Sequence, residues 1–343
     1  MKEQLREVQE KYGAIFRENH DVPESFNRDR DALTADPLLI DRSDLGVLWM
    51  TGSDRLRFLH NQTTNRIDSI RPDRGMETIF VNSTGRTLDL ATVYATEDSL
   101  LILVDPNRRS FLLPWIDRYI FPMDKVEITD VSDNFGVFTL IGDRSGEYLQ
   151  KIGVSEEILA GVEGDHREVS VAIGPIRVAV GTGLDLPGYT LIVPVAILAP
   201  FWEELVKMGA IPAGSTVWET LRVRQGRPAA DRELTEDYNA LEAGLWRAIS
   251  FEKGCYIGQE TIARLNTYKG VKQRLWGIQL DRPVEVGTAI EGEAGKIGEI
   301  TSVVDNFALG YVKTKAGGPG LAVKVGEAKG EVVAVPYLRH EYL

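Results

Sequence analysis

The stretch Lys253-Gly254-Cys255-Tyr256-Ile257-Gly258-Gln259-Glu260 carries the only cysteine of a chain of 343 residues. One glycine stands directly before this cysteine and another three residues after it, so the backbone can turn tightly and approach a neighbour closely. From Gln259 to Leu265 the sequence has an acidic residue early and a basic residue later, which predicts the start of a helix. We therefore expect Cys255 on a loop that leads into a helix N-terminus.

This position favours a reactive thiol. The exposed N–H groups of a helix N-terminus and the ammonium of Lys253 would stabilise the thiolate, whereas the carboxylate of Glu260 would oppose it. The alternative is that Cys255 is a small buried hydrophobe, which a lone cysteine usually is. Because the surroundings are polar and flanked by glycine, we prefer the functional interpretation and name Cys255, Lys253, Gln259 and Glu260 as candidate catalytic residues.

The composition limits the classes of function. The chain is 43% hydrophobic and 26% charged, which is ordinary for a globular protein, and its net charge of −12 argues against a general affinity for nucleic acid. One cysteine excludes an internal disulfide framework. We expect neither a secretory signal nor a membrane span, and hence a cytoplasmic location. We expect no metal site, because the histidines show no ligand-like spacing: His20, His60, His166 and His340.

The order of predicted elements indicates an α+β fold with a β-rich end. Residues 47–62 and 137–152 each predict a strand, a turn containing Gly and Asp, and a short helix, which we interpret as a repeated α+β unit. From Val271 onward glycine becomes frequent and short strands alternate with turns. This pattern predicts a small all-β barrel or sandwich.

Two further patterns allow a functional and a structural interpretation. The run Gly181 to Leu186 begins like a dinucleotide-binding loop, but its third glycine is missing and a turn is the better interpretation. Trp218 and Arg222 lie four residues apart on a predicted helix, where they would share a face able to stack a flat ring and pair an anion. On spacing alone, a packed helix with Arg222 in a structural salt bridge is favoured.

The stretch from Lys253 to Glu260 resembles the signature of the YgfZ family, folate-binding proteins implicated in iron–sulfur cluster assembly or repair. Other segments are typical of the same family, namely 41–46, 58–65, 218–228, 242–245 and 298–302, and the resemblance covers the chain from about Leu38 to its end. These proteins are relatives of the aminomethyltransferase, or T-protein, of the glycine cleavage system.

The resemblance implies a three-domain cloverleaf fold with a central tetrahydrofolate site. Residues 1–50 with 136–250 would form the first α+β lobe, and residues 51–135 the second. Residues 251–270 would hold the cysteine motif and a linker helix, and residues 271–343 a C-terminal β-barrel. The residues we expect to contact the folate are Trp218, Arg222, Tyr94, Tyr189 and Asp89.

The chain departs from the aminomethyltransferase pattern at one decisive position. That family carries Asn-x-x-Gly-Gly-x-x-Asp-Asp, whereas Asn82, Gly85 and Asp89 match here and the second aspartate is Leu90. Thr190 also stands where the family has an acidic residue, and Trp218 replaces an arginine. Proton transfer at the folate nitrogen then has no obvious agent, so aminomethyl transfer is disfavoured.

Three functions follow as hypotheses. The first is a tetrahydrofolate-binding accessory protein for iron–sulfur enzymes or their assembly partners, which uses Cys255 as a reactive thiol. One cysteine cannot hold a cluster alone, so any cluster would need a partner. The second is a folate-dependent aminomethyltransferase or demethylase. The third is a binding or scaffold protein without chemistry, in which Cys255 is buried and unreactive.

Overall fold

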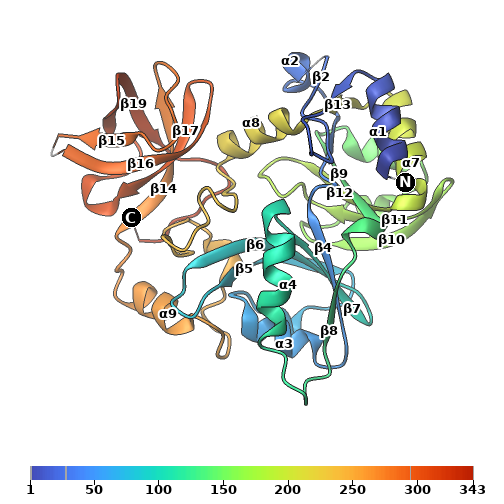
Figure 1. The fold of residues 1–343 in the computed structure, drawn as a ribbon, viewed down its shortest axis with the longest axis horizontal. Helices are drawn as coiled ribbons and strands as arrows, with labels where there is room; N and C mark the ends of the chain where they lie inside the picture. The colour runs from blue at the N-terminus through green and yellow to red at the C-terminus, as the bar shows by residue number, and fades with distance from the viewer. Residues whose placement is uncertain (1, 28, 294, 343) are drawn as a thin grey trace. The chain divides into compact units, whose positions relative to one another are not determined.

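The computed structural model describes residues 2–27, 29–293 and 295–342 (Figure 1). Contacts within the chain divide it into two compact units. Unit 1 comprises residues 1–55, 70–76 and 92–219, and unit 2 comprises residues 56–69, 77–91 and 220–343. Each unit has its own hydrophobic core, as expected for a chain of this length.

Unit 1 contains a six-stranded sheet in the order β10-β11-β12-β9-β3-β13, in which only the β13–β3 pair is parallel among the pairs described. Buried apolar side chains such as Leu39, Phe138 and Leu191 pack against Phe201 and Trp202 of helix α7. The strands are β3 (Leu38–Asp41), β9 (Phe135–Ile141), β10 (His166–Val171), β11 (Gly174–Val180), β12 (Gly188–Pro194) and β13 (Ile211–Ala213). The helices of this part are α1 (Lys2–Lys11), α2 (Asp29–Ala32), α5 (Ser145–Lys151), α6 (Glu156–Leu159) and α7 (Leu198–Lys207).

A second sheet has the strand order β5-β6-β7-β4-β8, and the residues of β5 and of β6 are each divided between unit 1 and unit 2. Within unit 1, Val47 and Leu101 of this sheet pack in one buried cluster with Val137 and Ile192 of the first. The strands are β4 (Gly46–Thr51), β5 (Arg74–Val81), β6 (Thr87–Ala95), β7 (Ser99–Val104) and β8 (Glu127–Asp130), with helix α4 (Arg109–Asp117). A short separate pair, β1 (Ala14–Ile15) and β2 (Ser25–Phe26), lies near the N-terminus.

Unit 2 ends in a closed six-stranded barrel, drawn in orange and red in Figure 1. The strand order is β14-β17-β16-β15-β18-β19, and β19 closes on β14. The barrel interior is filled by Ile278, Ile290, Ile300 and other aliphatic side chains. The strands are β14 (Gln273–Leu280), β15 (Ala289–Gly292), β16 (Gly295–Val304), β17 (Phe307–Lys313), β18 (Ala322–Val325) and β19 (Ala328–Val333).

The rest of unit 2 carries the cysteine motif. Helix α3 (Arg55–Gln62) precedes it in the chain, α8 (Ser215–Gln225) runs from unit 1 into unit 2, and α9 (Gln259–Thr267) follows the motif directly. The loop from 226 to 258 packs around a core that includes Leu234, Leu241 and Tyr256 together with Leu90 of β6.

The predicted fold class is confirmed: α+β elements precede a small C-terminal β-barrel. The repeated unit is also present, as β4 with α3 and as β9 with α5, and each pair is joined through a glycine with positive φ, Gly52 and Gly142. The four-part domain division stays a prediction. None of the helices in the described ranges has the length and apolar character that crossing a bilayer demands.

Candidate functional site

Lys253 anchors the signature stretch to the end of helix α3. Its ammonium donates hydrogen bonds to three backbone carbonyl oxygens, which belong to His60 (2.5 Å), Thr63 (2.6 Å) and Asn65 (2.8 Å). The carbonyl groups of the last turn of a helix have no partner within the helix and attract cations. Since only 7% of Lys253 is exposed, its ammonium interacts with these carbonyl oxygens and hardly with water.

Opposing effects act on the protonation of Lys253. Burial lowers its pKa to about 7, while the carboxylate of Asp68 acts to raise it. The three carbonyl oxygens also favour the ammonium form, because they accept hydrogen bonds. The Nζ atom lies 4.6 Å from the ring centroid of Tyr256, whose own pKa is raised to about 12 by burial.

Cys255 is exposed, so the alternative that it is a small buried hydrophobe is wrong. The residue lies on an irregular loop, and α9 begins four residues later at Gln259. The N–H group of Ile257 donates to the carbonyl oxygen of Asn61 in α3 at 3.1 Å. Gln259 and Glu260 form the first turn of α9, where Glu260 is exposed. The expected loop before a helix N-terminus is confirmed.

The signature stretch meets the turn at residues 82–86 through two glycines. Gly258 has φ +78°, and a Cβ added there would lie 2.5 Å from the carbonyl oxygen of Asn82 and 2.8 Å from Cα of Gly85. Gly85 has φ +74°, and a Cβ on it would lie 3.1 Å from the carbonyl oxygen of Gly258. Both positions therefore require glycine, for backbone conformation and for space.

We expect Gly258→Ala to destabilise unit 2 by more than its left-handed backbone alone explains. Gly287→Ala is the matched control, because Gly287 has φ +85° and nothing lies within 4 Å of a Cβ built there. The control should lose about 1–2 kcal/mol from the left-handed conformation, and Gly258→Ala about 1–3 kcal/mol more from the contact with the 82–86 turn. Denaturant unfolding of both variants measures the difference, and equal losses would show that the close approach is unimportant.

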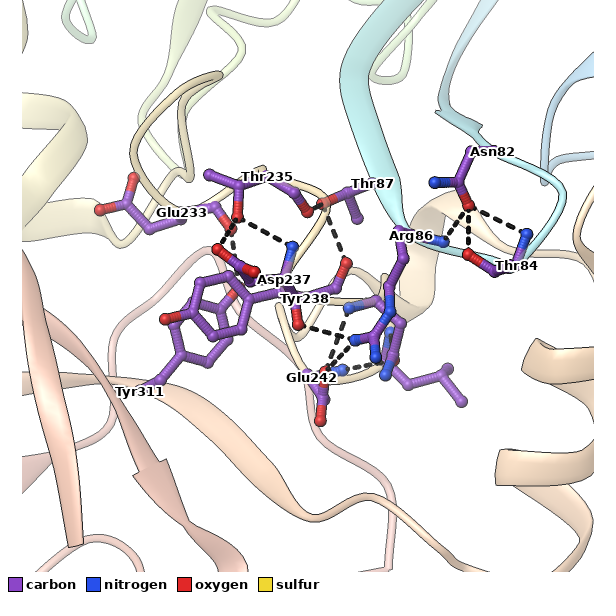
Figure 2. Close-up of polar contacts among 12 residues, drawn as sticks. Asn82, Thr84, Arg86, Thr87, Glu233, Thr235, Asp237, Tyr238, Glu242 and Tyr311 are labelled. Carbon is purple, nitrogen blue, oxygen red and sulfur yellow. Dashed lines mark hydrogen bonds and ion pairs between the residues drawn. The ribbon is translucent and has the colours of Figure 1, made fainter.

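The 82–86 turn is held by the side chain of Asn82. Its Oδ1 accepts hydrogen bonds from the N–H of Thr84 (3.0 Å), the hydroxyl of Thr84 (2.8 Å) and the N–H of Arg86 (3.0 Å), as Figure 2 shows. Its Nδ2 donates to Glu236 at 2.8 Å. Asn82, which the sequence identified only as a match to a motif, thus fixes the turn that receives Gly258.

Arg86 joins the same turn to the loop at residues 235–242. Its Nη1 donates to the carbonyl oxygen of Asp237 at 2.7 Å and lies 3.6 Å from the carboxylate of Glu242 (Figure 2). Glu242 and Asn239 hold the turn that follows with two reciprocal hydrogen bonds. The Asn239 side chain accepts a hydrogen bond from the N–H of Glu242, and the Glu242 carboxylate accepts one from the N–H of Asn239. Burial raises the pKa of Glu242.

Arg222 lies in a buried ion pair. Its Nη1 is 3.0 Å from Glu233, of which 0% is exposed, and its Nη2 donates to the hydroxyl of Ser302 at 2.7 Å. Glu233 also accepts hydrogen bonds from the hydroxyl groups of Thr301 and Ser302, each at 2.7 Å. Arg222 therefore forms the structural salt bridge that we favoured from its spacing. This ion pair connects the 226–245 loop to the barrel.

The other predicted folate contacts lie partly in unit 1. The guanidinium of Arg42 is 3.6 Å from the ring centroid of Trp218. Tyr94 is buried with its ring 5.0 Å from that of His166, and the Tyr189 hydroxyl donates to the carbonyl oxygen of Leu159 at 2.9 Å. The predicted set is therefore divided between the units and is not one cluster within either of them.

The strand β6 carries Asp89 and Leu90 on opposite faces, because neighbouring residues of a strand alternate. Leu90 belongs to the hydrophobic core of unit 2, with Ile79, Val81 and Val223 as members of the same cluster. Asp89 is fully buried. The leucine that replaces the second aspartate is thus a core residue of unit 2.

A cavity of about 360 Å³ lies in unit 1, and none of its lining residues was predicted as a site residue. Charged side chains in its wall pair with one another: Arg74 with Asp165, and Arg167 with Asp73 at 3.5 Å. His166 is also part of the wall. Burial lowers its pKa to about 4. No group of three or more His, Cys, Asp or Glu in the described ranges is arranged to hold a metal ion.

Sequence reasoning missed His60, which lies beside the signature stretch. Its backbone carbonyl oxygen accepts a hydrogen bond from the Lys253 ammonium, and its ring Nδ1 lies 3.1 Å from the carboxylate of Asp68. Lys253 and His60 are 193 residues apart in the chain. No periodicity encodes such a contact. The only available signal was that His60 and Asn61 fall in a segment typical of the YgfZ family.

Comparison with known proteins assigns the chain to a family. The sequence model described as "GCVT N-terminal domain" matches residues 6–253. A chloroplastic protein of Arabidopsis thaliana, At1g60990, named as a candidate transferase, is 40% identical over 94% of this chain and 76% of its own length. An aminomethyltransferase of Caldanaerobacter subterraneus is 28% identical over 89% of this chain and 80% of its own length.

A solved structure extends the likeness to the whole fold. The glycine cleavage system aminomethyltransferase T of Bartonella henselae matches with a TM-score of 0.86 at 17% identity, over 99% of this chain and 98% of that one. At this identity the match concerns the fold alone. Together with the family match over more than half of the sequence, it shows that the chain belongs to the GCVT family and has the fold of the glycine cleavage aminomethyltransferase.

Proposed function

We propose that this protein binds tetrahydrofolate and acts in the transfer of a folate-borne one-carbon unit, as the names of its aminomethyltransferase relatives imply. The observation that carries the proposal is the family match together with a whole-chain likeness of fold. Tetrahydrofolate has a flat pterin and an anionic glutamate tail, and small-molecule pockets generally supply aromatic side chains and a few placed polar groups for such ligands.

Asp89 is the carboxylate that remains for proton transfer in the 82–90 segment. The second aspartate of the family pattern is Leu90, which is packed in the core. Asp89 is buried at the beginning of β6, directly after the turn that Asn82 fixes. We therefore propose Asp89 as the acid–base residue of any transfer step.

A titration with tetrahydrofolate, read by tryptophan fluorescence, tests the binding. Saturable quenching that weakens in Trp218→Leu is expected. Turnover of aminomethyl and methyl donors with tetrahydrofolate tests the reaction, and Asp89→Asn should lower it by about 100-fold or more with binding retained. Asp98→Asn, a change at an exposed aspartate, serves as the control. Absence of saturable binding would refute the folate proposal, and absence of product across the donor panel would refute the transferase.

The exposure of Cys255 favours a second candidate function. As in the YgfZ proteins, Cys255 would serve as a reactive thiol in iron–sulfur cluster assembly or repair, with iron–sulfur enzymes or assembly proteins as partners. Its position on an anchored, exposed loop before a helix N-terminus supports this proposal. The replacement of the second aspartate by Leu90 points in the same direction.

Replacement of the cysteine tests this candidate. Cys255→Ser and Cys255→Ala should fold normally, because the side chain is exposed, and should lose activity in a cell-based assay of iron–sulfur enzymes. Thr267→Ser, on the same segment, provides a control for conservative change. Full activity of both cysteine variants would eliminate the thiol mechanism but leave the folate proposal untouched.

A further inference from the structure

Arg274 is a buried arginine whose guanidinium lacks a counter-ion among the described residues. It lies in strand β14 of unit 2, and only 3% of it is exposed. Its Nη2 donates a hydrogen bond to the carbonyl oxygen of Tyr342 at 2.8 Å. Its Nε and Nη1 atoms are buried and have no hydrogen-bond partner. Three of the five N–H groups that a guanidinium carries are therefore unused.

A charge in this position calls for an anion. Arginine stays protonated in proteins, and a buried charge without a counter-ion is costly. Burial lowers the pKa of Arg274, and the group that raises it again is the side chain of Tyr342, which is not a carboxylate. Since apolar residues can replace buried charges without loss of stability, packing in the barrel does not explain why an arginine stands here.

A second unused donor borders the same tyrosine. The Nε1 atom of Trp246 is buried without a hydrogen-bond partner, although a buried indole N–H normally finds one. The ring centroid of Tyr342 lies 5.2 Å from that of Trp246, 5.8 Å from Cζ of Arg274 and 5.6 Å from Nζ of Lys269. The carboxylate of the next residue, Glu341, is exposed and pairs with neither cation in the described part of the chain. Donors and positive charge thus converge on Tyr342, and acceptors are lacking.

Tyr342 covers these donors but is held weakly. Its backbone has φ +41°, in the left-handed region that is unfavourable for a residue with a side chain. Its hydroxyl donates to the carbonyl oxygen of Leu265 at 3.5 Å, which is long for a bond between two oxygens. Moving this side chain aside therefore costs little, and it would open the guanidinium of Arg274 to solvent.

We propose that Arg274 and Trp246 form a binding site for an oxyanion, either a carboxylate or a phosphate group, and that Tyr342 covers this site until the ligand displaces it. Arginine binds both groups through two parallel N–H···O hydrogen bonds. The ammonium of Lys269 adds positive charge at the rim, which attracts an anion. None of the predicted folate contacts belongs to this site, so the inference does not depend on the proposed function.

Thermal unfolding of the full chain with increasing inorganic phosphate, and separately with glutarate, tests the site in the absence of folate. A ligand that binds only the folded chain raises the midpoint in a saturable way. Arg282→Met, at an arginine whose side chain is 62% exposed, should keep this response and thereby reports the general effect of the salts. Arg274→Met should fold, because it removes a buried charge, and should lose the saturable part.

A saturable response that Arg274→Met abolishes supports the proposal, and the anion that gives it identifies the group that is bound. Equal responses in Arg274→Met and Arg282→Met would refute the site, as would the absence of a saturable response to both anions.

Tyr342→Ala separates the cover from the site. It should bind the responding anion about threefold to tenfold more tightly, because displacement of the tyrosine ring no longer opposes binding. Trp246→Phe should weaken binding by a similar factor, because it removes one N–H donor. Isothermal titration calorimetry measures both changes. Unchanged or weaker binding in Tyr342→Ala would refute the cover. Unchanged binding in Trp246→Phe would refute the role of the indole, and it would refute the site as well if Arg274→Met does not fold.

Discussion

Arg222→Met should destabilise unit 2 by about 3–5 kcal/mol, because it leaves the buried carboxylate of Glu233 without its cation. The two side chains are 3% and 0% exposed and lie 3.0 Å apart. The hydroxyl groups of Thr301 and Ser302 also donate to Glu233, so the charge can neither reach water nor move to another partner. Denaturant unfolding of the full chain, followed by the signal of the barrel, measures the loss.

Arg224→Met on the same helix is the matched control. Arg224 pairs with Asp305 at 3.3 Å, but its side chain is 48% exposed and that of Asp305 is 72% exposed. Exposed ion pairs contribute about 0–1 kcal/mol, so the same chemical change should have little effect there. Equal losses in the two variants would mean that the Arg222–Glu233 pair does not hold the 226–245 loop to the barrel.

Glu233→Gln separates charge from shape at this pair. The amide keeps the size of the carboxylate but loses its charge, and its NH₂ group faces donors from Arg222, Thr301 and Ser302. We expect a loss comparable with that of Arg222→Met. If Glu233→Gln were as stable as the unsubstituted protein, the pair would act only through packing.

Periodicity predicted the elements that are long and regular. The barrel strands β14, β16 and β17 have seven to ten residues, and α9 follows from the charge order after Gly258. Strand β15 has four residues and a register shift between Ile290 and Glu291, which interrupts the alternation that would predict a strand. Helix α6 has four residues, too few to show a helical period. Short elements are fixed by tertiary contacts, which a local pattern does not contain.

The candidate site shows more clearly that a local sequence pattern does not contain tertiary contacts. The sequence placed Cys255 correctly on a loop before a helix, because glycine and charge order are local signals. The sequence predicted that the ammonium of Lys253 stabilises the thiolate of Cys255. In the structure this ammonium donates hydrogen bonds to three carbonyl groups that lie 188 to 193 residues earlier in the chain. We considered both roles for Arg222, since spacing of four residues shows a shared face but not the partner. His60 was missed altogether.

Lys253→Met should release the signature stretch from α3 and destabilise unit 2. Three backbone carbonyl groups lose their donor together, and each buried acceptor left without a hydrogen bond costs about 1–3 kcal/mol. Lys269→Met is the control, because Lys269 is exposed. Hydrogen exchange should show faster opening at Ile257, whose N–H bond to Asn61 closes the other side of the loop. Unchanged exchange there would contradict the anchoring role.

The pH dependence of stability tests the protonation state of Lys253. Burial lowers the folded pKa of Lys253 to about 7, below its ordinary value of 10.5, so between these values the unfolded chain binds more protons than the folded one. Stability must then rise with pH across this window, by at most about 1.4 kcal/mol per unit, and this gain is lost as pH falls through 7. Lys253→Met cannot titrate and should lack the slope. Parallel pH profiles for the two proteins would contradict the lowered pKa and show that the three carbonyl oxygens, which accept hydrogen bonds from the ammonium, outweigh the effect of burial.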